Sequence, residues 1–315
     1  MRHARNGALS RIGIGQAEGI MAGYRVVLTL LAAIGTANGG AFAASPTIAP
    51  FKDELFAYPE PVASRDGGRV LDVPYSEARD IDRRDEIPER RVARRYVDLA
   101  PDQTRRDLVF PAPDGPLRWA SVGDDARASL IVVFVHGRNG DRRLGMNDWT
   151  FGGNFNRLKN LVTQAGGLYA TVDGGALGAA DATKVAALLR DLKARHGEAP
   201  LMLACGSMGG ELCWTALAGS DVSRAVDGLV LLGGSSDMAR LDRIEREGRP
   251  LPILLAHGSR DKVYAMDAQL AFFEGVRRRD PRYPIRFVVF DDGNHGTPVR
   301  MIDWRDTLNW LLNPH

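Results

Sequence analysis

The sequence predicts an α/β fold in which a mostly parallel central sheet is covered by helices on both faces. From residue 107 onward, apolar runs of strand length alternate with segments of helical periodicity. The run over residues 130–135 is apolar throughout, as expected of a strand buried on both faces. Polar loops that contain glycine follow four of the strands, and ligands bind such sheets beyond the carboxyl ends of the strands.

The predicted elements follow one another in an alternating order. A hairpin comes first, with strands over residues 108–110 and 117–121 on either side of Pro113-Asp114-Gly115. Glycines end two of the predicted helices. The remaining predicted strands span 130–135, 168–172, 201–205, 229–232, 253–256 and 285–290, and the predicted helices span 154–164, 181–196 with Asp181 as the cap, 265–278 and 299–312.

The composition is that of an ordinary globular protein. The 315 residues suit one large domain or two small ones, and 44% of them are hydrophobic and 25% charged. A formal net charge of +2 is too small to indicate a nucleic-acid partner. The arginines within residues 83–95 are interleaved with Asp85, Glu86 and Glu89, which is typical of a solvated surface of mixed charge.

Residues 1–43 have the features of a secretory signal peptide. Four arginines precede an apolar run over residues 26–37, and small residues then lead to Ala43. The pattern predicts export to the periplasm or the medium, with cleavage after Ala43. The run is shorter than the ~20 residues of a membrane-spanning helix, so we expect no stable membrane span after cleavage, although an uncleaved anchor is the alternative. Met21 would give a signal of more typical length.

Residues 44–106 are rich in proline, arginine and aspartate. We expect them to form an irregular N-terminal extension that wraps the domain of residues 107–315. Short strands are predicted near 70–73 and 96–99.

The chain has two cysteines, Cys205 and Cys213. An exported protein could pair them. However, Cys205 ends a predicted strand, whereas Cys213 lies on the second turn of the helix that follows. We therefore expect two buried free thiols.

The stretch over residues 201–210 predicts a serine on a sharp turn between a strand and a helix. Ser207 follows the apolar strand, and a helical pattern begins soon after it. Such a turn points the hydroxyl out of the sheet, and only small residues fit two positions before and after the serine. Gly209 meets this rule, and Cys205 meets it less well. Serine beside glycine is also common in ordinary turns.

Three other predicted strands end in polar loops that a parallel sheet brings to the same edge. One loop begins at His136, the second runs from His257 to Asp261, and the third carries His295 between glycines. With the Ser207 turn, these loops resemble the α/β-hydrolase superfamily, in which the triad follows the order Ser, Asp or Glu, His. The resemblance covers residues 107–315, and the cysteine before the serine is its one departure.

The resemblance implies the roles of a catalytic triad. Ser207 is the expected nucleophile, and His295 is the base that takes its proton and later protonates the leaving group. Asp261 is expected to accept the other ring N–H of His295 and to stabilise the imidazolium. The resemblance also implies that the backbone N–H groups of Arg138 and Met208 bind the oxyanion.

Three other aspartates lie after predicted strands of the same region. Asp237 follows a strand and is the alternative to Asp261, whereas Asp291 and Asp292 lie too near His295 in sequence to orient it.

Two further histidines, His136 and His257, are expected to shape their loops through hydrogen bonds. Asp173 is expected to be a turn residue. No cluster of histidine, aspartate and cysteine has the spacing of metal ligands, so we expect neither a metal nor another cofactor.

Between the strands over 229–232 and 253–256 there is room for one small helix, near 238–247. Members of this superfamily often carry a large lid at that place, so we expect little or no lid and an open site. The loop over 138–151 could line this site with Arg142, Arg143, Trp149 and Phe151, or it could be a solvated loop with two aromatic residues in the core.

The sequence thus predicts an exported serine hydrolase that cleaves carboxylic esters, small or polymeric, through an acyl-enzyme. A peptidase or amidase with the same triad is one alternative. A catalytically silent hydrolase fold used for binding is another.

Overall fold

The computed structural model describes residues 47–86, 90–244 and 249–314. The predicted signal peptide over residues 1–43 lies outside these ranges. The described part is built on one large sheet and a two-stranded one, formed by β3 and β4. The strands are β1 (Ala63–Arg65), β2 (Val70–Pro74), β3 (Asp85–Glu86), β4 (Arg91–Val92), β5 (Arg106–Ala112), β6 (Gly115–Gly123), β7 (Ile131–Val135), β8 (Leu168–Val172), β9 (Leu201–Gly206), β10 (Gly228–Leu232), β11 (Ile253–Gly258) and β12 (Ile285–Asp291).

The large sheet is mostly parallel, as predicted. Its described strands lie in the order β1-β2-β12-β11-β10-β9-β7-β8-β6-β5. The run from β2 to β8 is parallel throughout, and the antiparallel pairs β1–β2, β6–β8 and β5–β6 lie towards the two ends of the sheet. Every residue of β7 and β9 is buried, because helices cover both faces of these central strands.

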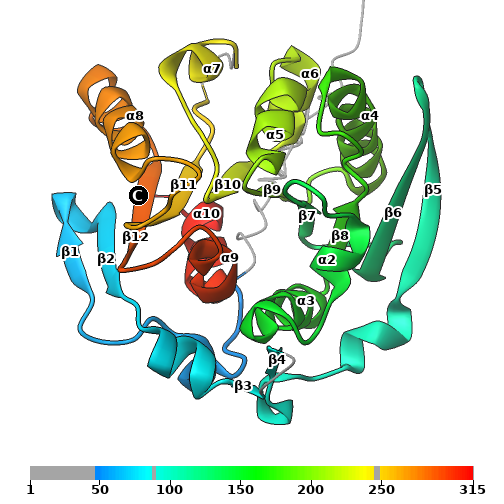
Figure 1. Ribbon diagram of the computed structural model, residues 1–315. Helices are drawn as coiled ribbons and strands as arrows, with labels where there is room; N and C mark the ends of the chain where they lie inside the picture. The colour runs from blue at the N-terminus through cyan, green and yellow to red at the C-terminus, as the bar shows by residue number, and fades with distance from the viewer. Residues whose placement is uncertain (1–46, 87–89, 245–248, 315) are drawn as a thin grey trace, which may run out of the picture. The chain divides into compact units, whose positions relative to one another are not determined.

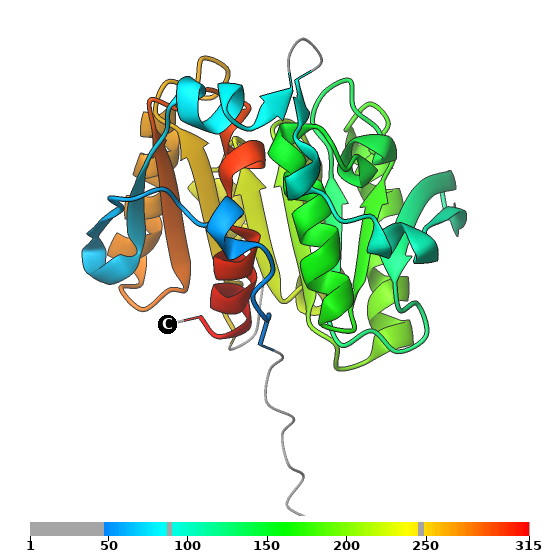
Figure 2. The same ribbon diagram turned by 90° about the horizontal axis from the view of Figure 1, so that it is seen from below.

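Helices lie on both sides of the large sheet (Figure 1). One side carries α4, α5, α6, α7 and α8, and the other carries α3, α9 and α10. In Figure 2 the green α3 and the red α10 lie in front of the strands. The helices are α1 (Asp53–Phe56), α2 (Arg142–Met146), α3 (Asn154–Gln164), α4 (Ala179–His196), α5 (Gly209–Leu217), α6 (Ser220–Ala225), α7 (Met238–Asp242), α8 (Met266–Arg279), α9 (Thr297–Met301) and α10 (Trp304–Leu312).

Two helix predictions were wrong in detail. The segment over 299–312 forms two helices, α9 and α10, because the carboxylate of Asp303 caps α10 by accepting the N–H groups of Arg305 and Asp306. Helix α4 begins at Ala179 rather than after Asp181. Asp181 lies in its first turn and accepts the N–H of Ala176 in the preceding loop at 2.9 Å.

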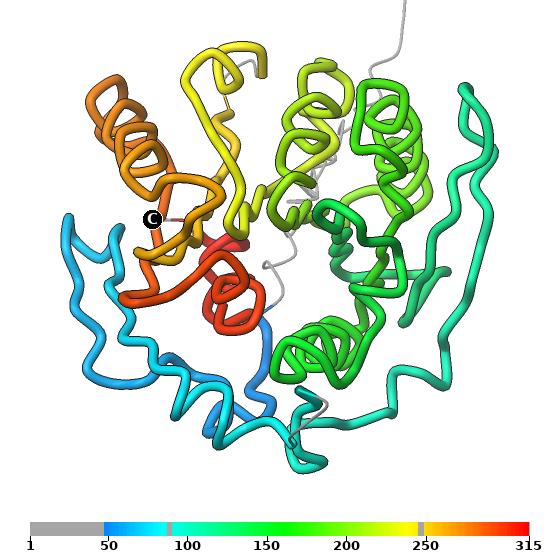
Figure 3. The backbone as a smooth tube through the Cα atoms, in the orientation of Figure 1, coloured from blue at the N-terminus to red at the C-terminus, as the bar shows by residue number. Residues whose placement is uncertain are grey.

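The N-terminal extension is more regular than predicted. The strand near 70–73 is confirmed as β2, which pairs with β12 and adds two strands to the large sheet together with β1. The strand predicted near 96–99 is wrong, since Arg94–Tyr96 forms a 3-10 turn and residues 97–99 have no regular structure. Figure 3 shows the chain passing from β2 to β5 across the side that carries α3, α9 and α10.

Between β10 and β11 the described residues form one helix, the five-residue α7. The prediction of little or no lid is therefore confirmed for this part of the chain. None of the helices in the described ranges combines the length and the apolar character needed to cross a membrane.

Candidate active site

Ser207 lies on a strained turn between β9 and α5. Its φ is +52°, a left-handed value that residues other than glycine rarely adopt. The N–H of Ser207 donates to the carbonyl oxygen of Leu232 at 2.8 Å and so ties the turn to β10. At Gly209 a Cβ would lie 2.4 Å from the carbonyl oxygen of His136, so the turn admits no side chain there. This geometry presents the Ser207 hydroxyl at the carboxyl edge of the sheet.

The two cysteines form a disulfide, so the prediction of free thiols was wrong. The sulfur atoms of Cys205 and Cys213 are bonded, and the Cα atoms lie 6.6 Å apart. The tight turn at Ser207 brings α5 back beside the end of β9, which places the second turn of the helix within disulfide reach of the strand. Half-cystine therefore occupies the position two residues before Ser207, and it is fully buried.

The structure brings Ser207, His295 and Asp261 together in one chain of hydrogen bonds. His295 Nε2 lies 2.8 Å from Ser207 Oγ, and His295 Nδ1 lies 2.7 Å from Asp261 Oδ2. The three residues follow three different strands, β9, β12 and β11. This arrangement can withdraw the hydroxyl proton of the serine while the carboxylate fixes the tautomer of the imidazole.

The environment of Asp261 keeps its carboxylate ionised. Burial acts to raise the pKa of Asp261, but the hydrogen bond with His295 and the N–H groups of Val263 and Tyr264 outweigh it, and the pKa is lowered below its ordinary value. The two N–H groups donate to Oδ1 at 2.7 and 3.1 Å. Oδ2 also lies 3.2 Å from His257 Nε2. Asp261 is thus an anion held in one orientation toward His295.

Two residues beside Ser207, Arg138 and Met208, have backbone N–H groups without a hydrogen-bond partner among the described residues. Both residues line the cavity into which Ser207 opens. At Gly137 a Cβ would lie 2.9 Å from the Cβ of Ser207, so glycine lets this loop approach the serine closely. These N–H groups are available to an oxyanion formed at Ser207.

The histidines predicted to shape loops make hydrogen bonds of that kind. His136 Nε2 accepts the N–H of Gly174 at 2.8 Å, and its Nδ1 lies 2.7 Å from the carbonyl oxygen of Gly137. His257 Nε2 donates to the carbonyl oxygen of Tyr264 at 2.8 Å. His136 therefore holds the loop before Arg138, and His257 holds the loop that carries Asp261.

A cavity of about 520 Å³ opens beside Ser207 and has a mainly apolar lining. Tyr264 was not predicted to lie here, although it comes three residues after Asp261; its ring centroid is 5.9 Å from that of His295. The lining residues are Phe134, Gly137, Arg138, Asn139, Gly140, Leu144, Phe151, Gly206, Ser207, Met208, Leu232, Val263, Tyr264, His295, Gly296 and Val299.

Of the four side chains of the loop over 138–151 that could line the site, one does so. Phe151 lines the cavity. The guanidinium of Arg142 instead pairs with the carboxylates of Asp107 and Asp173, and that of Arg143 pairs with Asp141.

Trp149 faces the N-terminal extension instead of the cavity. The guanidinium of Arg91 lies 3.7 Å from the centroid of its ring.

The competing carboxylates have other roles. Asp237 caps α7 by accepting the N–H of Arg240, and Asp292 pairs with Arg260 at 2.6 Å. Asp291 is exposed at the end of β12 and accepts the hydroxyl of Ser259. In the described part of the chain, no three His, Cys, Asp or Glu residues are grouped so that they could hold a metal ion.

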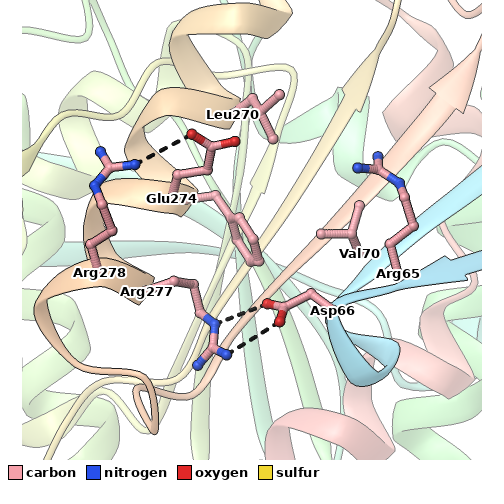
Figure 4. A pocket seen from close by; sticks show the side chains of 8 residues that line it. Arg65, Asp66, Val70, Leu270, Glu274, Arg277 and Arg278 are labelled. Carbon is pink, nitrogen blue, oxygen red and sulfur yellow. Dashed lines mark hydrogen bonds and ion pairs between the residues drawn. The ribbon is translucent and has the colours of Figure 1, made fainter.

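A second cavity, of about 350 Å³, lies between α8 and the β1–β2 hairpin (Figure 4). Its arginines are paired with carboxylates. Arg277 makes two hydrogen bonds to Asp66, and Arg278 pairs with Glu274, as the dashed lines in Figure 4 show. No serine, histidine or cysteine lines this cavity.

Comparisons with known proteins identify the fold. No family model matches the sequence, and no curated protein matches it. An Agrobacterium tumefaciens protein of unknown function, provisionally assigned to the alpha/beta hydrolases, superposes with a TM-score of 0.51 at 18% identity, over 66% of this chain and 97% of its own.

Two esterase structures give similar values. An esterase from Pyrococcus furiosus has a TM-score of 0.51 at 14% identity, over 68% of this chain and 95% of its own. A thermostable esterase has a TM-score of 0.52 at 16% identity, over 67% of this chain and 63% of its own. The chain has the α/β-hydrolase fold.

Proposed function

We propose that this chain of α/β-hydrolase fold is an exported serine hydrolase that cleaves carboxylic esters through an acyl-enzyme. The observation that carries the proposal is the hydrogen-bonded series from Asp261 through His295 to Ser207, at the edge of a mainly apolar cavity. A base within 2.8 Å of a serine hydroxyl is what nucleophilic catalysis at neutral pH requires.

In the first half of the reaction, Ser207 Oγ attacks the carbonyl carbon of the ester while His295 Nε2 takes the hydroxyl proton. The carbonyl oxygen becomes an oxyanion, which the N–H groups of Arg138 and Met208 stabilise. The tetrahedral intermediate then collapses. The bond to the alcohol oxygen breaks, and His295 gives its proton to the departing alcohol.

In the second half, water replaces the alcohol. His295 takes a proton from the water as its oxygen attacks the acyl carbon. The second tetrahedral intermediate releases the carboxylic acid, and the proton returns to Ser207 Oγ. Asp261 remains ionised throughout and stabilises the imidazolium form of His295 in both halves.

One feature supports an ester substrate, and another supports export from the cytoplasm. The cavity is open and mainly apolar, which suits a small ester or an exposed ester of a polymer. The Cys205–Cys213 disulfide fits a protein that matures in an oxidising compartment, in agreement with a signal peptide over residues 1–43. We propose cleavage after Ala43, which leaves the extension over 44–106 attached to the hydrolase domain over 107–315.

Labelling followed by a substrate panel tests the proposal. A fluorophosphonate probe should modify the parent protein at Ser207, and peptide mass spectrometry would locate the adduct. Ser259→Ala is the matched control, because Ser259 lies in another loop at the same edge of the sheet, and this variant should still be labelled.

The panel consists of short acyl esters and the corresponding anilides. Faster hydrolysis of the esters supports the proposal. Faster hydrolysis of the anilides would indicate an amidase, and a protein that is neither labelled nor active would indicate a binding role for the fold.

A further inference from the structure

Two side chains of the cavity wall, Phe151 and Val299, belong to segments that pack against the N-terminal extension. Phe151 begins a 3-10 turn that runs to Gly153, and Val299 lies within α9. Asn154 joins the two segments, because its Nδ2 donates to the carbonyl oxygens of Val299 and Ile302, both at 3.0 Å. We call Phe151 and Val299, with the backbone that carries them, the extension-side wall.

A buried ion pair fixes α9 from behind this wall. Arg300, the neighbour of Val299, makes two hydrogen bonds to Asp85 of the extension, at 2.5 Å through Nη2 and 3.1 Å through Nη1. Its Nη1 also donates to the carbonyl oxygen of Asp80 at 2.9 Å. The side chain of Asp85 has no exposed surface, and that of Arg300 is 10% exposed. If α9 moved away from this position, Arg300 and Asp85 would separate and their charges would be buried without a partner. The ion pair therefore holds the helix in one orientation.

Arg84 of the extension holds the other segment. Its Nη2 donates to the carbonyl oxygen of Gly152 at 3.2 Å, and its guanidinium lies 5.2 Å and 4.9 Å from the ring centroids of Phe56 and Tyr96. A Cβ at Gly152 would lie 3.0 Å from Nη1 of Arg300 and 3.3 Å from Nη2 of Arg84. The backbone beside Phe151 therefore packs directly on both guanidinium groups.

We infer that the extension, through the contacts of its Asp85 with Arg300 and of its Arg84 with Gly152, positions the extension-side wall and thereby limits the size of the substrate group accepted on that side of the cavity. This inference rests on the proposed esterase function. It gives the extension a part in specificity, whereas the nucleophile, base and oxyanion donors all come from the hydrolase domain. Asp85, Arg84 and Arg300 are positioning residues, because they act through Phe151 and Val299.

The test is the size preference of the variant Asp85→Asn, which keeps the volume of the side chain and removes its charge. Two substrate series are used: 4-nitrophenyl esters from acetate to octanoate, and acetates of alcohols from ethyl to naphthyl. In at least one series, the ratio of kcat/KM for the largest substrate to that for the smallest should rise threefold or more. We expect this rise because a wall that is held less firmly can move to admit a larger group. If the variant only lost stability, kcat/KM would fall by the same factor for all substrates.

Asp53→Asn is the matched control from the same extension. Asp53 pairs with Arg157 and Arg305, neither of which lines the cavity, at 2.9 Å each. This variant should keep the size preference of the parent. If Asp85→Asn does not fold, the double variant Asp85→Leu/Arg300→Met replaces it, because it removes both charges together.

The outcomes separate this inference from the function on which it rests. An unchanged size ratio in a folded Asp85 variant, or an equal change in Asp53→Asn, would overturn the inference while ester hydrolysis by the parent still supports the proposed function. A parent protein that cleaves none of the esters would contradict the proposed function, and the inference would fall with it.

Discussion

Cys205 and Cys213 are joined by a disulfide that spans the turn of Ser207. Cys205 is next to last in β9 and Cys213 lies midway along α5, so the bond ties the strand before the serine to the helix after it. Cys205 occupies the position two residues before Ser207, where the turn requires a small residue. A covalent link thus holds together the two elements that present Ser207.

We expect the double variant Cys205→Ala/Cys213→Ala to fold and to lose stability. The bond closes a loop with a sequence separation of 8, and loop-closure entropy for this length corresponds to about 2.5 kcal/mol. Urea denaturation should show a loss of this size in the free energy of unfolding. Reductant should lower the stability of the parent and leave the variant unaffected. Equal sensitivity of the two proteins to reductant would count against the assignment.

Gly209→Ala should destabilise the turn far more than Gly206→Ala. A Cβ at Gly209 would lie 2.4 Å and 2.9 Å from two backbone carbonyl oxygens, whereas at Gly206 the nearest atom is a ring carbon of Phe134 at 3.5 Å. We expect the free energy of unfolding to fall by about 2 to 3 kcal/mol for the first variant and to change by less than about 1 kcal/mol for the second. Similar urea midpoints would show that the turn tolerates a side chain at Gly209.

Asp261→Asn should reduce kcat by about 10⁴-fold, because the amide cannot hold the imidazole in its required tautomer or stabilise the imidazolium. Steady-state hydrolysis of 4-nitrophenyl butyrate measures this effect. Asp237→Asn is the control, since Asp237 is the carboxylate that the sequence offered as an alternative, and it caps α7 and pairs with the guanidinium of Arg240. Loss of activity in the control, with activity retained in Asp261→Asn, would reverse the assignment.

Stability should depend on pH through His257. Burial of the ring lowers the pKa of His257 below its ordinary value, although the Tyr264 carbonyl oxygen and Asp261 oppose this effect. The imidazole of His257 therefore binds a proton more readily in the unfolded chain than in the folded chain. The stability from neutral His257 is therefore present above the unfolded pKa, about 6.5, and is lost as the pH falls through the folded value.

His257→Gln removes this titration. The free energies of unfolding of parent and variant are compared at pH 7.5 and pH 5. We expect the parent to lose stability relative to the variant at the lower pH. A difference that stays constant with pH would show that His257 does not titrate differently in the two states.

The positions of the strands and of the polar loops at their ends could be predicted, because each depends on a few neighbouring residues. The apolar run before Ser207, the small residue at 209 and the loops that end in Asp261 and His295 are each read from a few neighbouring positions. The parallel sheet then brings these loops to one edge, since strand direction decides where they meet.

Features that depend on distant contacts could not be predicted in this way. The Cys205–Cys213 bond follows from the path of α5 back along β9, which no spacing rule specifies. The contact of Arg84 with Gly152 joins positions 68 residues apart, and that of Arg300 with Asp85 joins positions 215 apart. The break before α10 arises because Asp303 caps a helix within a segment whose apolar periodicity looks continuous.

The central claim is that Ser207 forms an acyl-enzyme. Rapid mixing of the parent with 4-nitrophenyl acetate should release a burst of nitrophenol equal to the concentration of active sites, followed by slower turnover. Ser207→Ala should give no burst, and its steady rate should be lower by at least about 10³-fold. A variant that releases nitrophenol as fast as the parent, with the same burst, would contradict the claim.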